Sequence, residues 1–410
     1  MHDRTILYTA SFLRALATGL IGVHLGFYLA ALRFEAGAIG LVVTLGLAGA
    51  TAATVGVTWG ADRVGHRRLL AGLAAVAGLG GVALAVSTHP AVVGAAAFLG
   101  MVNGMGRDRG AALVLEQAVL PATGSDDRRT FNFAVYHLCQ DFGHALGALL
   151  AGVPAMLAST GAPATLVSPR TPVFFYALLM LVPLFLYPRL SPAVEPIAAS
   201  PGLRVSPGSR RFLAKLSGLF ALDALGSGFL TTTLLAYFFH VRFGVSAAAV
   251  GPLFFGARIA NALSHLAAAW LARRIGLVNT MVFTHIPSSL LLLTVAVAPS
   301  FPVAAALFLL REALVEMDVP TRQSYVMAIV RPEERTVASG VTHLVRLGAW
   351  AVAPVFAGAA MQRFALLAPL AVGAAMKISY DLLLYFSFRK VRPPEEERAQ
   401  NAGTVDVGPP

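Results

Sequence analysis

Charged residues inside long apolar segments are the feature of this sequence that bears most directly on chemistry. Eight are basic: Arg14, Arg107, Arg109, Arg258, Arg311, Arg322, Arg346 and Lys377. Eight are acidic: Asp108, Glu116, Asp141, Asp223, Glu312, Glu316, Asp318 and Asp381. A charge in an apolar interior costs a few kcal/mol unless it faces a cavity or pairs with an opposite charge. The equal numbers therefore predict extensive pairing, and Lys377 and Asp381, four residues apart, are predicted to pair with each other.

The carboxylates of the segment 301–329 lie close together along the chain. Glu312 and Glu316 are four residues apart, and Asp318 shares a helix face with Arg311. Two neighbouring carboxylates at low dielectric are not expected to ionise together, so one would carry a proton. The alternative is static pairing with nearby arginines, namely Arg311, Arg322 and Arg346. Pro320 lacks a backbone N–H and is predicted to break the helix beside Asp318.

Two further groups have helical spacing. In the segment 91–118, Arg107, Asp108 and Arg109 precede Glu116, and Arg109 and Glu116 are predicted to share a face. This group is either a coupling site or an ion network that locks the helix to its neighbours.

In the segment 130–158, His137, Asp141 and His144 also fall on one predicted face. Hydrogen bonding across the bundle, a proton relay and a partial site for a divalent metal all stay open for them. A matching His343 in the second half of the chain favours a structural role for His137.

The elements that hold these residues are predicted to cross a membrane. The chain is 57% hydrophobic and 12% charged, whereas soluble proteins carry about 25% charged residues. Because a span needs about 20 apolar residues, 410 residues hold about twelve. We predict an all-α membrane protein with helices at 6–32, 37–60, 69–88, 91–118, 130–158, 172–188, 212–240, 246–271, 278–298, 301–329, 336–360 and 365–388.

The positive charge of the loops predicts the orientation. About nineteen Lys and Arg residues fall in loops on the side of the N-terminus, against about four on the other side. By the positive-inside rule, both termini are cytoplasmic. The net charge of +11 then reflects topology and not nucleic-acid binding. We expect a multi-pass protein of the inner (plasma) membrane of a bacterial-type cell.

The two halves of the chain resemble each other at an offset of roughly 206–211 residues. Arg33-Phe34 matches Arg242-Phe243, and Arg14 lines up with Asp223, which makes the latter two a candidate pair between the halves. We predict a six-helix bundle at 1–190, a cytoplasmic linker at 191–210, a second bundle at 211–390 and a disordered tail at 391–410. A repeat of this kind is a known transporter plan with its site between the halves.

The loop from Thr58 to Arg68 reads T-W-G-A-D-R-V-G-H-R-R. It resembles the signature loop of the major facilitator superfamily (MFS), G-x-x-x-D-R-x-G-x-R-R. The matching residues are Asp62, Arg63, Gly65, Arg67 and Arg68, and a degenerate second copy contains Arg274 and Gly276. Thr58 replaces the first glycine, which is expected to loosen a helix contact. The resemblance implies that Asp62 acts in a cytoplasmic gate; the alternative is that these charges only anchor the topology.

The same resemblance implies the MFS fold and secondary active transport of a small solute by alternating access, with protons as the driving ion. The proton-coupling candidates are Asp108, Glu116, Asp141, Glu312, Glu316 and Asp318. The candidates for the substrate cavity are Arg14, Arg107, Arg109, His137, His144, Asp223, Arg258, Arg311 and Arg346. The mid-span arginines favour a substrate with an anionic or polar group.

Other functions stay open as alternatives. They are multidrug-type efflux of lipophilic compounds, a membrane enzyme, and a non-transporting membrane sensor or scaffold. The sequence has no phosphate-binding loop of the ATPase type, no nucleophile elbow and one cysteine, Cys139. We therefore expect no catalytic residues, no cofactor and no resident metal. The expected partners are a small molecule, protons and membrane lipid, and the expected state is a monomer.

Overall fold

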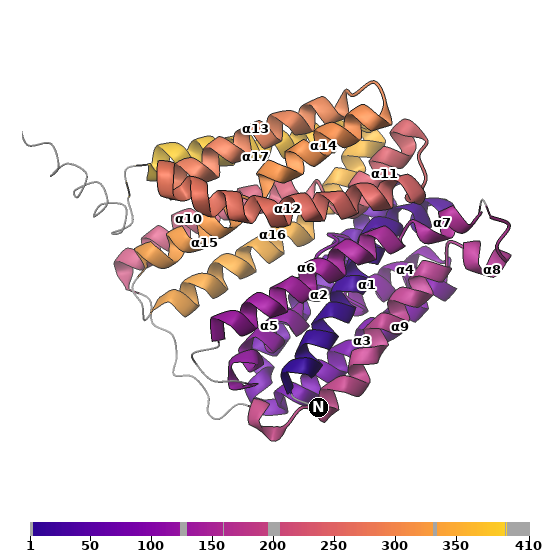
Figure 1. Ribbon diagram of the computed structural model, residues 1–410, viewed down its shortest axis with the longest axis horizontal. Helices are drawn as coiled ribbons and strands as arrows, with labels where there is room; N and C mark the ends of the chain where they lie inside the picture. The colour runs from indigo at the N-terminus through magenta and orange to yellow at the C-terminus, as the bar shows by residue number, and fades with distance from the viewer. Residues whose placement is uncertain are drawn as a thin grey trace, which may run out of the picture. The chain divides into compact units, whose positions relative to one another are not determined.

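The computed structural model describes residues 3–123, 129–158, 160–195, 206–330, 334–389 and 391, and this part of the chain is helical without a strand (Figure 1). The twelve predicted spans correspond to α1 (Asp3–Ala31), α2 (Ala36–Val64), α3 (His66–Val86), α4 (Pro90–Leu99) with α5 (Ala111–Val119), α6 (Arg129–Leu150), α9 (Thr171–Leu186), α10 (Pro207–Gly228) with α11 (Thr232–Phe243), α12 (Ala247–Ile275), α13 (Leu277–Ala296), α14 (Phe301–Val315) with α15 (Asp318–Ile329), α16 (Arg335–Arg363) and α17 (Ala368–Phe388). Two short helices, α7 (Val153–Ala158) and α8 (Ala164–Val167), precede α9.

Nine helical segments of the described chain are long and apolar enough to cross a membrane. Many of their large apolar side chains are exposed, among them Leu79, Leu178, Phe185 and Phe386. Such an apolar outer surface is stable against lipid and would be unfavourable in water. The fold is therefore that of a multi-pass membrane protein, as the sequence predicted.

Three spans are broken, and two of the breaks contradict the predicted helices. The helix predicted at 91–118 was wrong as a continuous element, since residues 100–110 separate α4 from α5. The span predicted at 212–240 is present, but residues 229–231 interrupt its helix between α10 and α11. The break between α14 and α15 falls at residues 316–317. It lies directly before Asp318, which confirms the break predicted from Pro320.

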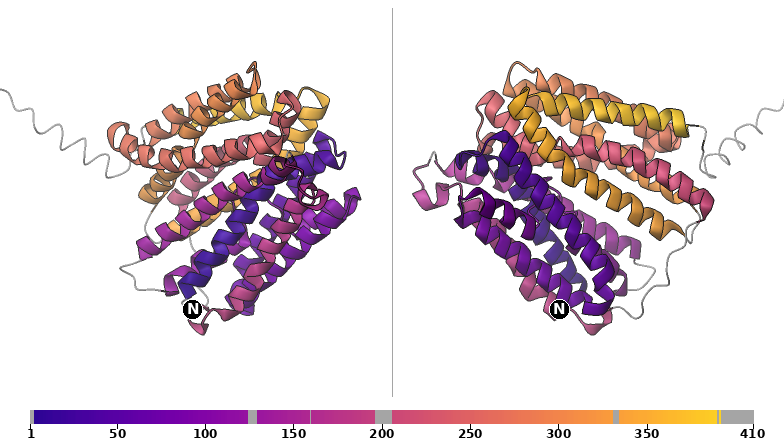
Figure 2. Two further views of the ribbon diagram at one scale, coloured as in Figure 1. Left: turned by 45° about the vertical axis from the view of Figure 1, so that its right-hand side comes forward. Right: turned by 180° about the vertical axis from the view of Figure 1, so that it is seen from behind.

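Contacts group the chain into two compact units. Unit 1 contains Met1–Ser200, Ser227–Arg258 and Trp350–Pro369, and unit 2 contains Pro201–Gly226, Ile259–Ala349 and Leu370–Pro410. Borders of the units fall inside α10, α12, α16 and α17. The predicted division at a linker of residues 191–210 stays a prediction. Figure 2 shows the long helices of both units from two further sides.

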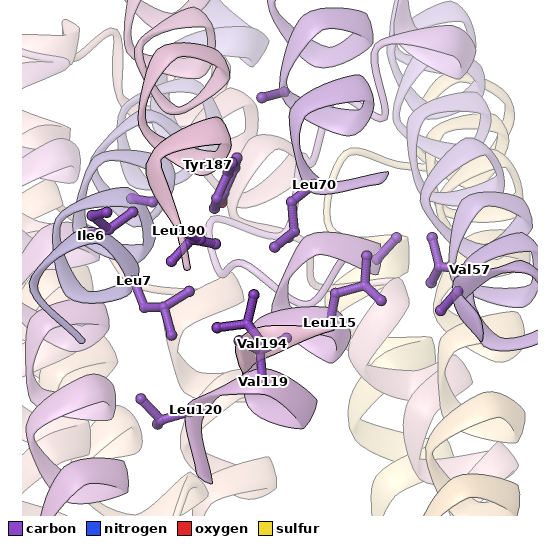
Figure 3. Close-up of a cluster of buried hydrophobic side chains, with 14 of the residues drawn as sticks. Ile6, Leu7, Val57, Leu70, Leu115, Val119, Leu120, Tyr187, Leu190 and Val194 are labelled. Atoms are coloured by element: carbon purple, nitrogen blue, oxygen red, sulfur yellow. The ribbon is translucent and has the colours of Figure 1, made fainter. Parts of the chain in front are cut away.

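Unit 1 is built around α1. This helix packs most extensively on α6, and also on α9 and α11. Glycines bring α1 and α6 together, because a Cβ on Gly19 would lie 2.3 Å from the His144 carbonyl oxygen and one on Gly147 would lie 2.1 Å from that of Leu16. Small residues of this kind drive helix packing where both helices are apolar. A cluster of buried side chains that includes Leu7, Leu70, Leu115, Tyr187 and Val194 forms one end of this unit (Figure 3).

Unit 2 is built around α13, which packs on α14 and α15. Its core is rich in aromatic side chains, and Phe220, Tyr325 and Tyr380 are almost fully buried in it. Tyr325 and Phe388 meet edge to face with their ring centroids 6.2 Å apart. This geometry is favourable for aromatic pairs and fixes the packing of α15 against α17.

Candidate functional site

The first buried ion cluster lies in unit 1 and centres on Arg14 of α1. Its Nη1 and Nη2 atoms donate to both carboxylate oxygens of Glu116, at 2.6 and 2.8 Å, and its Nε donates to Asp108 at 3.0 Å. The hydroxyls of Tyr136 and Tyr187 also donate to Glu116, at 2.6 and 2.8 Å. Glu116 is 0% exposed. Its carboxylate thus accepts four hydrogen bonds, which offsets the cost of burying the charge.

Hydrogen bonds from side chains hold the segment between α4 and α5 in a non-helical conformation. Asn103 accepts the backbone N–H of Met105 at 2.8 Å and donates to the carbonyl of Arg107 at 2.6 Å. The backbone N–H of Asp108 donates to Nε2 of His144 at 2.7 Å. Since Arg109 lies in this segment and not in α5, the predicted helix face shared with Glu116 was wrong. Arg109 instead places its guanidinium 4.3 Å from the ring centroid of Trp350.

Within unit 1, the backbone at the break between α4 and α5 forms hydrogen bonds with residues at the start of α11 and with α12. The carbonyl of Gly104 accepts the backbone N–H of Thr233, at 3.1 Å, just inside α11. The hydroxyl of Thr232 donates to the carbonyl of Met105 at 2.8 Å, and Nη2 of Arg258 donates to that of Gly106 at 3.2 Å. Irregular backbone at membrane depth requires such partners. The break between α4 and α5 and the break between α10 and α11 therefore form one structural element.

Positive charge gathers at this element. Arg107 and Arg109 lie in the segment between α4 and α5, and Arg258 of α12 reaches this segment through its hydrogen bond to the carbonyl of Gly106. The one carboxylate in the same segment, Asp108, is paired with Arg14 at 3.0 Å. Three mid-span arginines that the sequence assigned to the substrate cavity thus lie together in unit 1. Such a group suits an anionic ligand, because guanidinium groups bind carboxylates and phosphates well.

A small cavity of about 50 Å³ adjoins the Arg14 cluster. Its polar lining includes Thr18, Asn103, Asp108, Tyr176 and Tyr187. A space of this size holds a few water molecules, whereas pockets for organic ligands measure about 300–1,000 Å³. The cavity can hydrate the ion cluster but cannot enclose an organic solute.

The predicted face of the segment 130–158, which corresponds to α6, does not form one polar site. His137 and Asp141 have exposed side chains, whereas His144 is buried and accepts the Asp108 N–H. The three residues therefore lie in different surroundings. Only His144 belongs to the group of charges around the break between α4 and α5.

The second buried ion cluster lies in unit 2 and centres on Asp223 of α10. Its carboxylate accepts from Nη1 of Arg346 at 2.7 Å and from Nζ of Lys377 at 2.9 Å, with Nη1 of Arg322 at 3.5 Å. Arg322 also pairs with Asp318, one turn earlier on α15. The partners of Asp223 belong to its own unit, as do those of Arg14. The predicted Arg14–Asp223 pair gains no support from these contacts.

A histidine that the sequence analysis did not single out completes this cluster. Nδ1 of His285, on α13, lies 2.9 Å from Asp381, and its Nε2 lies 3.2 Å from Nζ of Lys377. We predicted that Lys377 and Asp381 pair with each other through their spacing of four residues. That prediction was wrong, because the His285 ring binds both residues.

The carboxylates of α14 have separate partners. Glu312 pairs with Arg311 and accepts from Nδ2 of Asn261 at 2.9 Å. Glu316 lies beyond the end of α14, with its carboxylate 4.0 Å from Nε2 of His265. The predicted face shared by Arg311 and Asp318 is interrupted by the break. Static pairing thus accounts for Glu312 and Asp318 in this conformation.

The segment that follows α9 holds the loop between α2 and α3 in place through hydrogen bonds. Gly65 has φ 94°, a conformation that favours glycine, and it precedes α3. The carboxylate of Glu195 accepts the backbone N–H groups of His66 and Arg67, at 2.6 and 3.4 Å. Nη2 of Arg67 donates to the carbonyl of Pro188 at 2.6 Å. An acidic side chain therefore caps the positive end of α3.

The remaining residues of the two loop motifs can be placed as follows. Arg63 and Arg68 are exposed, and the side chain of Asp62 lies outside the described residues. In the second copy, Gly276 has φ 87° and precedes α13, as Gly65 precedes α3. The guanidinium of Arg274 lies 4.5 Å from the ring centroid of Trp270.

Within unit 1, α2 and α16 touch through glycines. A Cβ on Gly358 would lie 2.3 Å from the carbonyl oxygen of Ala36, and one on Gly40 would lie 2.3 Å from that of Pro354. The hydroxyl of Thr44 accepts the backbone N–H of Val355 at 2.9 Å. At the end of the same contact, the side chain of Gln362 binds that of Glu35. These residues fall near helix ends that the sequence places on the extracytoplasmic side.

Comparison with known proteins identifies the family. The sequence profile described as Major Facilitator Superfamily matches residues 7–354. The chain belongs to the Major Facilitator Superfamily. The twelve spans and the two loop motifs of this MFS protein are therefore those of a transporter family, which implies a small-molecule substrate.

Individual relatives of this MFS chain agree on the fold. It is 28% identical to the uncharacterized membrane protein YJR124C of Saccharomyces cerevisiae, over 94% of both chains. Its structure is similar to that of the nucleoside transporter NupG, with TM-score 0.74, 15% identity, and coverage of 95% and 98% of the two chains. It is also similar to a D-xylose–proton symporter, with TM-score 0.70, 13% identity, and coverage of 95% and 97%. At these identities the solved structures establish the MFS fold alone.

Proposed function

We propose that this chain is a secondary active transporter that moves a small organic solute with an anionic group, coupled to protons. The observation that carries the proposal is the group of Arg107, Arg109 and Arg258 at the joined breaks of two spans. An anion placed there would meet three guanidinium groups and the open backbone of residues 100–110. Broken helices form the substrate sites of many transporters.

The names of similar proteins do not decide the substrate class. The matching solved structures are described as transporters of nucleosides, D-xylose, peptides and organic anions. Solutes so different share one fold, so the substrate has to be argued from the site. The described charges of this site favour an anionic solute over a lipophilic cation, because a cation would be repelled by the arginines.

Alternating access is the transport mechanism that we propose. In this mechanism, the halves 1–190 and 211–390 rock about the site. We propose that the protein lies in the plasma membrane, with both termini in the cytoplasm. The glycine contact of α2 with α16 is the proposed extracytoplasmic gate. The loop with Asp62, Arg63, Gly65, Arg67 and Arg68, together with Arg274 and Gly276 in its second copy, is the proposed cytoplasmic gate.

Proton coupling is proposed for the acids on the broken spans. Asp108 and Glu116 are held by Arg14, and Asp318 is held by Arg322. A carboxylate that exchanges its arginine for a proton would change the charge of the site as the protein changes conformation. Glu312, Glu316 and Asp141 are further candidates for this role.

Thermal unfolding of the purified protein tests the substrate class. The panel would contain lactate, succinate, glucose 6-phosphate, uridine, xylose and tetraphenylphosphonium. A solute at about 100 times its Kd stabilises the folded state by about 2.7 kcal/mol. We expect an anionic member of the panel to raise the Tm, and Arg258→Met to abolish that rise. Arg242→Met, an exposed arginine in the same unit, is the matched control.

Stabilisation by uridine, xylose or the lipophilic cation alone would contradict the proposed substrate class. The same conclusion would follow if Arg258→Met and Arg242→Met responded equally to the anion.

A further inference from the structure

His285 of α13 bridges two charged residues of α17 in the buried part of unit 2. The imidazole is 1% exposed, and Asp381 is 0% exposed. Nδ1 of the ring lies 2.9 and 3.1 Å from the two oxygens of Asp381, and Nε2 lies 3.2 Å from Nζ of Lys377. Lys377 in turn lies 2.9 Å from Asp223. The four side chains form a continuous hydrogen-bonded chain.

The chemistry of these partners fixes where the ring proton lies. The ammonium group of Lys377 has only donors, so Nε2 of His285 has to accept. The carboxylate of Asp381 has only acceptors when ionised, so Nδ1 has to donate. With Lys377 charged and Asp381 ionised, the ring is neutral and its proton lies on Nδ1. Nε2 is the position at which a further proton can be added.

The charges around the ring are balanced before that proton arrives. The cluster holds three carboxylates, Asp223, Asp318 and Asp381, and three cations, Arg322, Arg346 and Lys377. The groups that face His285 directly are Asp381, Lys377 and Tyr380 from α17 and Asp223 from α10, whose carboxylate lies 3.9 Å from Nε2. Arg322 of α15 and Arg346 of α16 act on the ring through Asp223.

We propose that His285 is a proton-binding site whose occupancy decides whether Lys377 binds two partners or one. With Nε2 unprotonated, Lys377 binds both His285 and Asp223. With Nε2 protonated, two donors would face each other at 3.2 Å, and Lys377 is left with Asp223 alone. Lys377 then competes with Arg346 for the Asp223 carboxylate, so the proton acts on an arginine of α16.

The His285 site rests on the proposed function and adds to it a proton site in unit 2 that acts on Arg346, a candidate cavity residue. Arg346 is the most exposed member of the cluster, with 12% of its side chain accessible. The added proton leaves the cluster with one excess positive charge. An anionic solute would compensate that charge, so the binding of the solute and the binding of the proton would be coupled.

Carbon-13 NMR of the full chain, labelled at Cε1 of its histidines, tests the proton site without any solute. The sequence has 10 histidines, and the His285 signal is assigned by its loss in His285→Gln. We expect the chemical shift of this signal to change over a pH series from 9 to 5, because Nε2 gains a proton. Lys377→Met should alter this response, whereas the signal of His24, a buried histidine of unit 1, should not respond to that substitution. In Lys377→Met, Asp223 retains Arg322 and Arg346 as its cationic partners.

A His285 signal that is constant over this pH series would overturn the proposal, as would the same pH response in Lys377→Met and in the parent protein. A second readout concerns coupling. In proteoliposomes with an internal pH dye, the solute that stabilises the protein should drive a proton flux that His285→Gln loses and His24→Gln keeps. Coupled flux in His285→Gln would also overturn the proposal. If the wild type shows no flux with any solute, the transport proposal fails, while the NMR titration still decides the proton site.

Discussion

The contact between α2 and α16 predicts a measurable effect of a single methyl group. Gly358→Ala would place a Cβ 2.3 Å from the backbone oxygen of Ala36, where an ordinary contact begins at 3.4 Å. The two helices have to separate by about 1 Å to accept it. Because the obstacle is backbone, a side-chain rotation cannot relieve it.

The energetic effect depends on whether the contact opens during function. Overpacking of this kind costs about 1–3 kcal/mol. If only the closed state contains the contact, the substitution shifts the equilibrium toward the open state by about 5- to 150-fold. Gly348→Ala on the same helix is the matched control, since a Cβ there meets nothing within 4 Å.

Spin labels measure this shift directly. Cys139 is the one cysteine of the chain, so Cys139→Ser gives a background free of other thiols. Labels at Leu41→Cys of α2 and Phe364→Cys beyond α16 report their separation by pulsed dipolar spectroscopy. We expect Gly358→Ala to add or enlarge a longer-distance population, and Gly348→Ala to match the parent. A lower Tm with an unchanged distance distribution would refute the idea that this contact is a gate.

Three further substitutions test the Arg14 cluster, the cap of α3 and the loop motif. Glu116→Leu leaves Arg14 with Asp108 as its acidic partner but removes its charge-assisted hydrogen bonds to Glu116, which should cost about 1.5–3 kcal/mol of stability, seen as a lower Tm; in an Arg14→Met background the same change should cost far less. Glu195→Gln weakens the cap of α3 and should lower stability by about 0.3–1 kcal/mol at low ionic strength, with a smaller loss in high salt. Asp62→Asn should stop solute uptake into proteoliposomes while leaving the Tm shift by the bound solute intact, and unchanged uptake would contradict the gate role.

Much of the fold could be predicted because the membrane limits the possibilities. Long apolar runs have to be helices, and their number and order follow from length. The break before Asp318 was predicted from Pro320, a residue that cannot donate the helical hydrogen bond. The break in the fourth span was missed, although Gly100, Gly104, Gly106 and Gly110 lie within it and glycine weakens helices.

The candidate site could be predicted in composition but not in pairing. The equal numbers of acids and bases did indicate ion clusters. The spacing of Lys377 and Asp381 suggested a pair within one helix, yet both residues bind His285 from another helix. Helical spacing shows which residues share a face and not which neighbour lies opposite. A single histidine in an apolar helix gives no such information either, so His285 could be recognised only from its contacts.

Solute-evoked proton flux in proteoliposomes tests the central claim most directly. Purified protein would be reconstituted with an internal pH dye, and the panel used for thermal unfolding would be added outside at equal pH on both sides. We predict that one anionic solute moves protons across the membrane, that a proton ionophore abolishes the dye response, and that Arg258→Met prevents it. A solute that accumulates without any proton movement would contradict proton coupling. Absence of transport for every solute that stabilises the protein would contradict the transporter function itself.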